Sequence, residues 1–444
     1  MPHNTMNRRQ VLQSLAGLSL AVSAPRFLPC AFGEMAPNNR LRFASIGTGG
    51  RGSYDTTVLK RFAELTAVCD LDKRRLEEAK QKLGGGTVDD YVDYRKVLDR
   101  QDIDIVFCGT PDHWHTKICL DALEAGKHLF CEKPLTLTVQ ESQKICEAAR
   151  KSKQTMVVGT QRRIETPYFV RMANMVRQGL LGKIKRVVVS ISKSYNATMA
   201  PSKDQRFPLA QVPAEFDWNT WQGQVAERAY REKRSHVFYR YWYEYAGGRV
   251  TDWGAHYLDI ALWAMNLDQP GEGIVKIDPT DCLHPLPMKD GYPLEDDYYN
   301  TAHEFNIKLT ASNGVPMELE TRLNDGILFE GEKGRVFANC GRITGTPIEE
   351  QWDKDCFGEK EKRQLFRGRL PQSHADDFVT CIRNGELPVS DVFSHVRSLN
   401  ACHVINIAAR LGRTLAWDPV KETFPGEDQA NSFLAREQRK GFEF

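Results

Sequence analysis

The sequence predicts an α/β protein in which a doubly wound parallel sheet is followed by an α+β domain with a large, mostly antiparallel sheet. Up to about residue 160, short apolar runs alternate with amphipathic helical patterns, which is typical of parallel strands joined by helical crossovers. Beyond Gly159 the pattern changes to long connections and to strand-like runs that follow one another directly. The 444 residues, 41% of them hydrophobic, are ample for two such domains.

These patterns divide the chain into a leader at 1–38, a first domain at 39–160, a second domain at 161–415 and a surface tail at 416–444. In the first domain, strands are predicted at 41–46, 65–69, 103–108, 128–131 and 155–158, and helices at 53–62, 73–83, 94–98, 116–125 and 139–151. In the second domain, helices are predicted at 167–178, 252–265, 376–383 and 392–410, and strands at 185–194, 274–277, 301–309, 317–321, 326–330 and 334–339. Consecutive strands with long connections favour an antiparallel sheet with helices on one face.

A glycine motif links the first predicted strand to the first helix. The strand runs into Gly47-x-Gly49-x-x-Gly52, and the next strand ends in Asp70, 18 residues beyond the last glycine. Strand, glycine turn, helix, strand and acid in this order are typical of a dinucleotide-binding βαβ unit, although an ordinary glycine-rich turn is the alternative. Glycines let the pyrophosphate approach the backbone, and the helix start favours its charge. The predicted phosphate-binding residues are Gly47, Thr48, Gly49, Gly50, Arg51 and Gly52.

Asp70 decides which dinucleotide the sequence favours. Its carboxylate is expected to accept hydrogen bonds from the adenosine ribose hydroxyls, and a 2′-phosphate would face its negative charge. This favours NAD over NADP. Lys73, Arg74 and Arg75 follow directly and are the residues that could bind a 2′-phosphate instead.

Three further segments are expected to converge on one crevice, because the carboxyl ends of parallel strands meet at one edge of a sheet. They are Glu132-Lys133-Pro134 at a strand end, Gln161-Arg162-Arg163 after the first domain, and Gly247-Gly248-x3-Asp252-x-Gly254-x-His256-x2-Asp259. Asp252 and His256 are four residues apart and would share one face of the predicted helix.

These residue types suit the oxidation of an alcohol by hydride transfer. An imidazole titrates near neutral pH and can take the hydroxyl proton. A neighbouring carboxylate can orient it, and a lysine beside the nicotinamide can hold developing alkoxide charge. The alternative interpretations are a solvated lysine in a turn, a helix cap at Asp252 and a core histidine at His256.

In their order and spacing, these motifs resemble the Gfo/Idh/MocA family, named for glucose–fructose oxidoreductase and inositol dehydrogenase. The resemblance covers residues 41 to 415 and implies a Rossmann domain, then a domain with an open-faced sheet that often forms a homodimer or homotetramer interface. It implies that Lys133, Asp252 and His256 act on a sugar or polyol hydroxyl, and that Thr110, Pro111 and His113 lie along the nicotinamide ribose. Glu132 and Gln161 complete the expected cofactor-binding set.

An aromatic and basic stretch at 224–246 is the least family-like part of the second domain. Aromatic side chains here and just before it either stack on a sugar face or pack beneath a long loop, and the sequence does not decide between the two. The candidate substrate residues are Arg162, Trp221, Tyr239 and Trp242. Arg162, Arg163 and Asp259 are expected to have structural or supporting roles rather than catalytic ones.

His113-Trp114-His115, with Asp112 beside it, contains residue types that can bind a metal ion. No third and fourth ligand follow at a matching spacing, so a cofactor-lining loop is the interpretation favoured and no metal site is predicted. The eleven cysteines contain no CxxC pair, and Cys69, Cys108 and Cys131 each end a predicted strand, as small buried hydrophobes do. They do not form a disulfide framework.

The leader contains Asn7-Arg8-Arg9-Gln10, an apolar stretch at 11–22 and a small-residue region, and it resembles a twin-arginine export signal. The alternative is a disordered basic N-terminus. Since little free NAD exchanges outside the cytoplasm, an exported enzyme would work best by holding NAD tightly and restoring its redox state in each cycle. The net charge of +2 does not favour nucleic acid or an anionic membrane, and no later apolar run is long enough to span a bilayer.

Three functions remain open from the sequence. The first is an exported NAD-dependent oxidoreductase that acts on a carbohydrate or polyol. The second is a retaining glycosidase that uses NAD transiently, by oxidising C3, eliminating the aglycone, adding water and reducing the sugar again. The third is a non-catalytic sugar-binding or sensor protein, against which the apparently intact lysine, aspartate and histidine argue.

Overall fold

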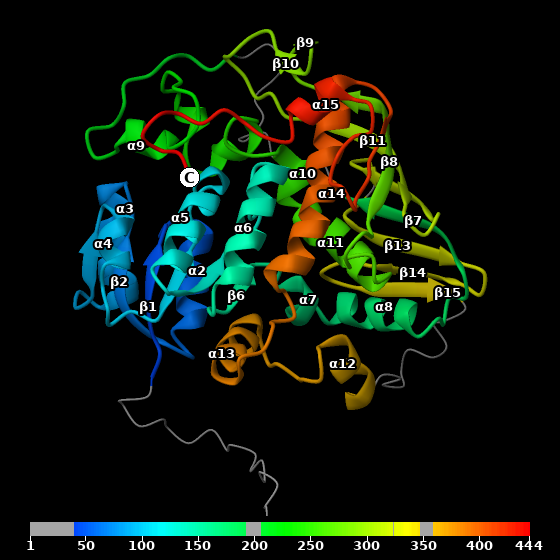
Figure 1. The fold of residues 1–444 in the computed structure, drawn as a ribbon, viewed down its shortest axis with the longest axis horizontal. Coiled ribbons are helices and arrows are strands. Elements are labelled where there is room, and N and C mark those ends of the chain that lie inside the picture. The colour runs from blue at the N-terminus through cyan, green and yellow to red at the C-terminus, as the bar shows by residue number, and fades with distance from the viewer. Residues whose placement is uncertain (1–39, 192–205, 323, 347–357) are drawn as a thin grey trace, which may run out of the picture. The chain divides into compact units, whose positions relative to one another are not determined.

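The computed structural model describes residues 40–191, 206–322, 324–346 and 358–444. The predicted export signal lies outside these residues. Two sheets organise residues 41–444, a parallel one near the start of the chain (blue to cyan) and a larger mixed one that follows (green to yellow) (Figure 1). None of the helices in the described segments has both the length and the apolar character that crossing a membrane requires.

The first sheet has six strands in the order β3-β2-β1-β4-β5-β6, and every pairing in it is parallel, as predicted. Its strands are β1 (Arg42–Ile46), β2 (Glu64–Cys69), β3 (Asp89–Tyr91), β4 (Ile105–Cys108), β5 (His128–Cys131) and β6 (Met156–Val158). The strand order reverses direction between β1 and β4. A crevice at the carboxyl ends of these two strands is where doubly wound sheets bind ligands.

Helices cover this sheet and connect its strands. They are α2 (Gly50–Leu59), α3 (Lys73–Gly84), α4 (Tyr94–Leu98), α5 (Asp112–Glu124) and α6 (Val139–Lys151). Asp72 caps α3 by accepting from the backbone N–H groups of Arg74 and Arg75, and Gly85 ends it in the left-handed region at φ 61°.

Two helices in this half begin earlier than predicted. α2 starts at Gly50, inside the glycine motif, and it buries Gly52, Thr56 and Leu59, while Tyr54 is 58% exposed. α5 starts at Asp112 because Pro111, with its fixed φ of −60°, precedes its first turn. Residues 112–115 are therefore helical and not part of a loop.

The second sheet has eight strands in the order β15-β14-β13-β7-β12-β11-β8-β16, and only the β12–β7 pair in it is parallel. Its strands are β7 (Ile184–Ser190), β8 (Ile274–Leu283), β11 (Glu304–Ala311), β12 (Pro316–Glu320), β13 (Gly326–Gly331), β14 (Arg335–Ala338), β15 (Ile343–Thr346) and β16 (Leu415–Ala416), and a separate hairpin is formed by β9 (Met288–Lys289) and β10 (Tyr292–Pro293). The predicted mostly antiparallel sheet is confirmed. The end of the predicted strand at 185–194 lies outside the described residues.

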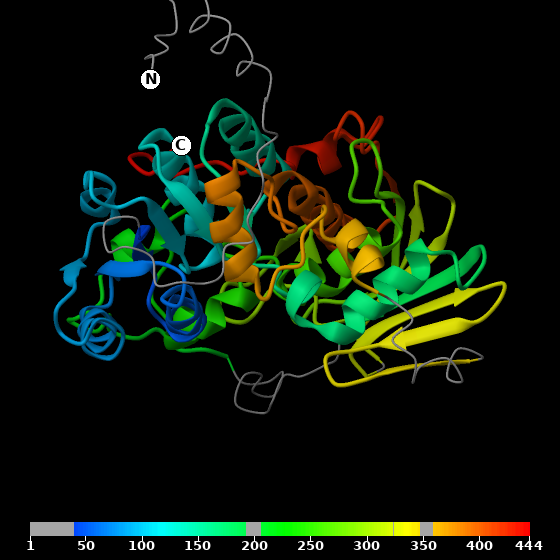
Figure 2. The same cartoon turned by 90° about the horizontal axis from the view of Figure 1, so that it is seen from below.

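The helices of this half are α7 (Arg162–Glu165), α8 (Pro167–Arg177), α9 (Trp218–Gln222), α10 (Gly248–Asp252), α11 (Gly254–Ala264), α12 (Glu359–Leu365), α13 (His374–Asn384), α14 (Val392–Leu411) and α15 (Asp428–Ser432), with short 3₁₀ helices at Glu232–Arg234 and His236–Tyr241. Of these, α8, α11 and α14 contact the second sheet and lie on one side of its yellow strands (Figure 2), whereas α13 packs on the first sheet. The long helix α14 is buried almost throughout and contacts both halves, α6 on one side and α11 and β8 on the other (Figure 1). Arg163 and Asp259 form a buried ion pair at 2.6 Å, as their predicted structural role requires.

The helix predicted at 252–265 begins earlier, at Gly248, and is interrupted at Trp253 between α10 and α11, although the backbone of Trp253 itself stays in the helical region (φ −94°, ψ −26°). The Asp252 carbonyl accepts a hydrogen bond from the Lys133 side chain at 2.9 Å, and the His256 N–H bonds the Trp253 carbonyl instead. The i to i+4 bond that would join the two helices is therefore absent.

The chain after residue 415 also differs from the surface tail predicted for it. Trp417, Phe424 and Phe433 are buried, and the Trp417 and Phe424 rings meet edge to face at 4.9 Å. The last residues return across α5 and α6 (red, Figure 1), where Phe442 packs on Trp114 with ring centroids 6.1 Å apart.

Candidate active site

A cavity of about 760 Å³ runs from the glycine turn at the carboxyl end of β1 to Lys133, Asp252 and His256. Residues from both halves of the chain line it, and some of them, such as Lys133 and Asp252, lie more than 100 positions apart in the sequence. Fifteen predicted site residues line it: Gly47, Gly49, Gly50, Arg51, Gly52, Asp70, Thr110, Pro111, Glu132, Lys133, Arg162, Trp221, Tyr239, Asp252 and His256.

The glycine turn is shaped for close contact between backbones. Gly47 has φ 84°, and a Cβ on it would lie 2.6 Å from the Thr110 nitrogen. A Cβ on Gly52 would lie 2.0 Å from the Gly47 carbonyl oxygen. The amino end of α2 therefore packs against the end of β1 and opens toward the cavity, an arrangement that fits a pyrophosphate.

Asp70 shapes this turn as well as facing the cavity. Its Oδ2 accepts from the Thr48 backbone nitrogen at 2.9 Å and from the Thr48 hydroxyl at 3.0 Å, and its Oδ1 accepts from the Asp72 nitrogen at 3.0 Å. Burial raises the pKa of Asp70, while these hydrogen bonds and the nearby Arg75 oppose the rise. Thr48 thus lies behind Asp70 and does not line the cavity.

Of the three basic residues weighed for a 2′-phosphate, Arg75 lines this end of the cavity, while Lys73 and Arg74 do not. Arg75 lies so close to the turn that a Cβ on Gly49 would meet its guanidinium. The Asp70 carboxylate and the Arg75 guanidinium therefore both line the end of the cavity where the adenosine ribose is expected.

Lys133 lies opposite the glycine turn and reaches across to the second half of the chain. Its ammonium donates to the Asp252 carboxylate Oδ1 at 2.6 Å and to the Asp252 carbonyl at 2.9 Å. Both side chains are about 15% exposed, which leaves the pair at the cavity wall. The neighbouring Glu132 is buried and accepts from the Gln161 amide at 2.5 Å, so Gln161 supports Glu132 without lining the cavity.

Burial shifts the pKa values of Asp252 and His256 in opposite directions, whereas the nearby cations lower both. Burial opposes ionisation of Asp252, but Lys133, Arg240 and Arg249 lower its pKa to about 2. Burial also lowers the pKa of His256 well below its ordinary value, and the charges of Lys133 and Arg162 add to this effect. Asp252 is therefore an anion and His256 a neutral imidazole at neutral pH. The His256 Nδ1 has no hydrogen-bond partner among the described residues.

Besides Thr48 and Gln161, two more predicted site residues do not line the cavity. His113 was placed along the nicotinamide ribose, but it is fully buried, with its Nε2 at 2.7 Å from the Trp221 carbonyl oxygen. This follows from the early start of α5, which turns His113 inward. Trp242 was a candidate for the substrate, but it is fully buried under the Arg234 guanidinium, 3.9 Å from the ring centroid, and donates to the Lys233 carbonyl.

The aromatic stretch is mostly a packing cluster. Trp218 stacks on Trp221 with centroids 4.9 Å apart, and Tyr241 is buried at 3% exposure. Of the three aromatic residues that were candidates for substrate binding, Trp221 and Tyr239 also line the cavity. The Tyr239 hydroxyl donates to the buried Asp112 at 2.5 Å, which fixes the ring at the cavity wall.

Several residues that line the cavity were not predicted from the sequence. They are Arg240, which lies 3.7 Å from Asp252, together with Phe216, Asp217, Thr220, His236, Gly441 and Phe442. Their positions depend on the path of the 206–246 segment and of the tail. No local motif marks them, although the basic and aromatic character of 224–246 was visible.

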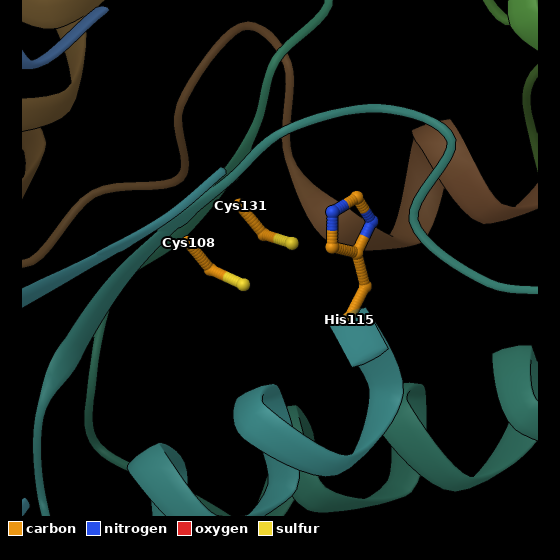
Figure 3. Close-up of side chains that lie close together, drawn as sticks. All are labelled: Cys108, His115 and Cys131. Carbon is orange, nitrogen blue, oxygen red and sulfur yellow. The ribbon is translucent and has the colours of Figure 1, made fainter. Parts of the chain in front are cut away.

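A buried group of Cys108, His115 and Cys131 lies directly behind the Thr110 and Pro134 loops, and Figure 3 shows the three side chains pointing toward one another. One potential ligand atom from each lies within 4.8 Å of the others. The His115 Nδ1 is 2.7 Å from the Pro134 oxygen and its Nε2 is 2.8 Å from the Thr110 oxygen. Because both nitrogens contact carbonyl groups, we interpret His115 as a residue that holds these two loops in place.

Comparison with known proteins identifies the chain. The profile described as "Oxidoreductase family, NAD-binding Rossmann fold" matches residues 41–160, and the profile described as "Oxidoreductase family, C-terminal alpha/beta domain" matches residues 166–340. The chain belongs to the Gfo/Idh/MocA family. Its first sheet and glycine turn are the NAD-binding Rossmann fold of that family, and NAD is the cofactor that this fold binds. The predicted family and fold class are confirmed.

Individual relatives match in part. A glycosyl hydrolase family 109 protein of Shewanella pealeana is 32% identical over 212 residues, which cover 40% of this chain and 44% of that protein. An inositol 2-dehydrogenase of Salmonella paratyphi B is 32% identical over 162 residues, 35% of this chain and 47% of that protein. The chain thus spans less than half the length of these curated relatives.

Similarity in fold extends further than similarity in sequence. The WlbA dehydrogenase of Bordetella pertussis, crystallised with NADH and UDP-GlcNAcA, aligns over 85% of this chain and 98% of its own. The TM-score is 0.60 at 17% identity, which establishes a common fold.

Proposed function

We propose that this protein is an NAD-dependent oxidoreductase that transfers hydride between the hydroxyl-bearing carbon of a sugar or polyol and the nicotinamide. The observation that carries this proposal is the contact between Lys133 and Asp252, which places an ammonium and a neutral His256 at one end of the cavity that begins at the glycine turn. A dinucleotide bound along the turn would extend toward these three residues.

The residues then have distinct roles. His256 accepts the hydroxyl proton, since its imidazole is neutral and lines the cavity beside Lys133. Lys133 binds the reacting oxygen and stabilises negative charge that develops on it. Asp252 holds the ammonium in position by accepting from it at 2.6 Å. Bound NAD would supply the hydride acceptor, and the glycine turn, Asp70, Thr110 and Pro111 would hold it.

The test begins with the cofactor. Purified protein is denatured, and the released nucleotide is identified by absorbance and mass; NAD is the expected result. Sugars and polyols are then screened for a change in nicotinamide absorbance. We expect His256→Gln to lose turnover while it retains NAD. His284→Gln, which changes a partly exposed histidine that does not line the cavity, should keep both turnover and NAD. Full turnover by the His256 variant would refute the proposed base.

A second candidate is the cleavage of glycosides without net redox change, by oxidation at C3, elimination of the aglycone, addition of water and reduction. The partial match to a glycosyl hydrolase family 109 protein favours it. Release of a phenol from an aryl glycoside, with no added NAD and no net change in nicotinamide absorbance, would support this chemistry. A stoichiometric, lasting reduction of NAD would support the simple dehydrogenase.

Two further proposals concern the setting of the reaction. The paired arginines Arg8 and Arg9 and the apolar stretch after them support export by the twin-arginine route, which fits a cofactor that is retained through each cycle. Fractionation of producing cells tests this. We also propose a homodimer or homotetramer formed through the eight-stranded sheet, which light scattering of the purified protein tests.

A further inference from the structure

The charges at the inner end of the cavity do not balance. Lys133, Arg162 and Arg240 line this end with three basic side chains, and two carboxylates line it with them, Asp252 and Glu132. Glu132 lies 3.7 Å from Arg51 and is not paired with Arg162. Asp252 lies 2.6 Å from Lys133 and 3.7 Å from Arg240, so it serves both. Arg162 is left without a counter-charge.

Arg162 is held in place by contacts that do not neutralise it. Its guanidinium lies 5.3 Å from the Trp253 ring centroid and 5.6 Å from that of Tyr257, and it contacts the Cys340 sulfur. No carboxylate of the described segments lies within ion-pair distance of it. A guanidinium stacked on aromatic rings presents its edge to a ligand, and that edge matches the planar fork of a carboxylate.

The cofactor does not account for this charge. Phosphate groups fit the glycine turn, where Arg51 lines the cavity and α2 begins. Arg162 lies instead at the start of α7, next to the Trp253 break that separates Asp252 from His256. Its charge contributes to the lowered pKa of His256, which places it at the reacting end.

We propose that Arg162 binds a carboxylate of the substrate, so that the cavity takes an acidic sugar such as a uronic acid or a glycoside of one. This inference rests on the proposed function and names its substrate class. The carboxylate pairs with Arg162 while the hydroxyl that loses hydride meets Lys133 and His256. The bond changes are those of the proposed reaction, and Arg162 takes no part in them.

The experiment compares matched sugars on the NAD-loaded protein. Galacturonate is set against galactose, glucuronate against glucose, and aryl glucuronide against aryl glucoside, each followed by nicotinamide absorbance, aglycone release and thermal shift. We expect acidic members to be turned over and to raise the melting temperature, with neutral members far weaker. Arg162→Gln should raise KM for the acidic sugar by about 10- to 100-fold, the loss expected for a charged hydrogen bond. Arg162→Lys should restore part of the affinity.

The matched control is Arg363→Gln, which removes the same charge from an exposed residue on α12 and should leave KM unchanged. Neutral sugars bound and turned over as well as acidic ones would overturn the inference and leave the proposed function standing. An equal fall in kcat for both sugar classes in Arg162→Gln would also overturn it, because Arg162 would then act on the reacting centre generally. If no sugar of either class binds or reacts, the proposed function fails and the inference with it.

Discussion

Replacing Lys133 by methionine should have two effects that can be measured separately, one on the stability of the fold and one on turnover. The substitution keeps the length of the side chain and removes the ammonium that donates to Asp252 at 2.6 and 2.9 Å. The Asp252 carboxylate then keeps only Arg240, at 3.7 Å, as a close partner. A buried pair that loses one member leaves the other charge poorly compensated.

The size of the effect follows from the pKa of Asp252. Cations lower it from 3.8 to about 2, which corresponds to about 2 kcal/mol of stability at neutral pH. Since a depressed carboxyl pKa stabilises the fold above the ordinary value, this contribution is present at neutral pH and is lost as the pH falls from about 4 to 2. Lys133→Met should therefore lower the free energy of unfolding by about 2 kcal/mol at neutral pH, and the loss of alkoxide stabilisation should lower kcat by about 10²- to 10³-fold.

Chemical denaturation measures the first effect and single-turnover reduction of bound NAD the second. Adding Asp252→Asn to Lys133→Met should recover most of the stability, because the carboxylate that lost its ammonium partner is then neutral, while turnover stays low. Lys117→Met is the control, since Lys117 lines the same cavity and contacts Asp121 at 3.1 Å in a partly exposed pair of small energetic value. Wild-type turnover in Lys133→Met would refute the assigned role. Failure of Asp252→Asn to restore stability would refute the charge argument.

Three other substitutions or conditions test the structure. Gly52→Ala should lose bound NAD and cost about 1–3 kcal/mol, since its Cβ would lie 2.0 Å from the Gly47 oxygen; retention of NAD would argue against the close packing of α2 on β1. Arg163→Met should destabilise the fold by about 3–5 kcal/mol by leaving Asp259 buried and unpaired, and a change under a third of that in urea titration would contradict the buried pair. Burial lowers the pKa of His395 to about 3, so its neutral form stabilises the fold fully above the ordinary value of 6.5 and less as the pH falls toward 3; His395→Asn should flatten this decline in denaturation curves.

The first sheet was predictable because its signals are local. Alternating apolar and helical runs gave five of its six strands and every crossover helix, with bounds shifted by a few residues. The bounds that moved furthest were those of α5, where a proline set the start of the helix, and of the single helix predicted at 252–265. The helix is interrupted after Asp252, whose carbonyl oxygen accepts a hydrogen bond from Lys133, 119 residues away in the sequence.

The glycine turn, Asp70 and the Glu132-Lys133 pair were likewise visible in the sequence, since each is a short motif at the end of a strand. The roles of His113 and Trp242 were not, because whether a side chain faces a cavity or the core depends on the rotation of its helix or loop. The same is true of Cys108 and Cys131, which the parallel pairing of β4 and β5 brings beside His115.

The sequence by itself determined the family, the dinucleotide fold and the residue types available for hydride transfer, because these depend on spacing along a few dozen residues. Only the tertiary structure decided which charges meet. Lys133 and Asp252 come from different halves of the chain, Arg240 joins them from an irregular segment, and Arg162 remains without a carboxylate partner in the described residues. Electrostatic pairing depends on distances of a few ångströms, and such distances between remote segments are set by the packing of both halves around α14.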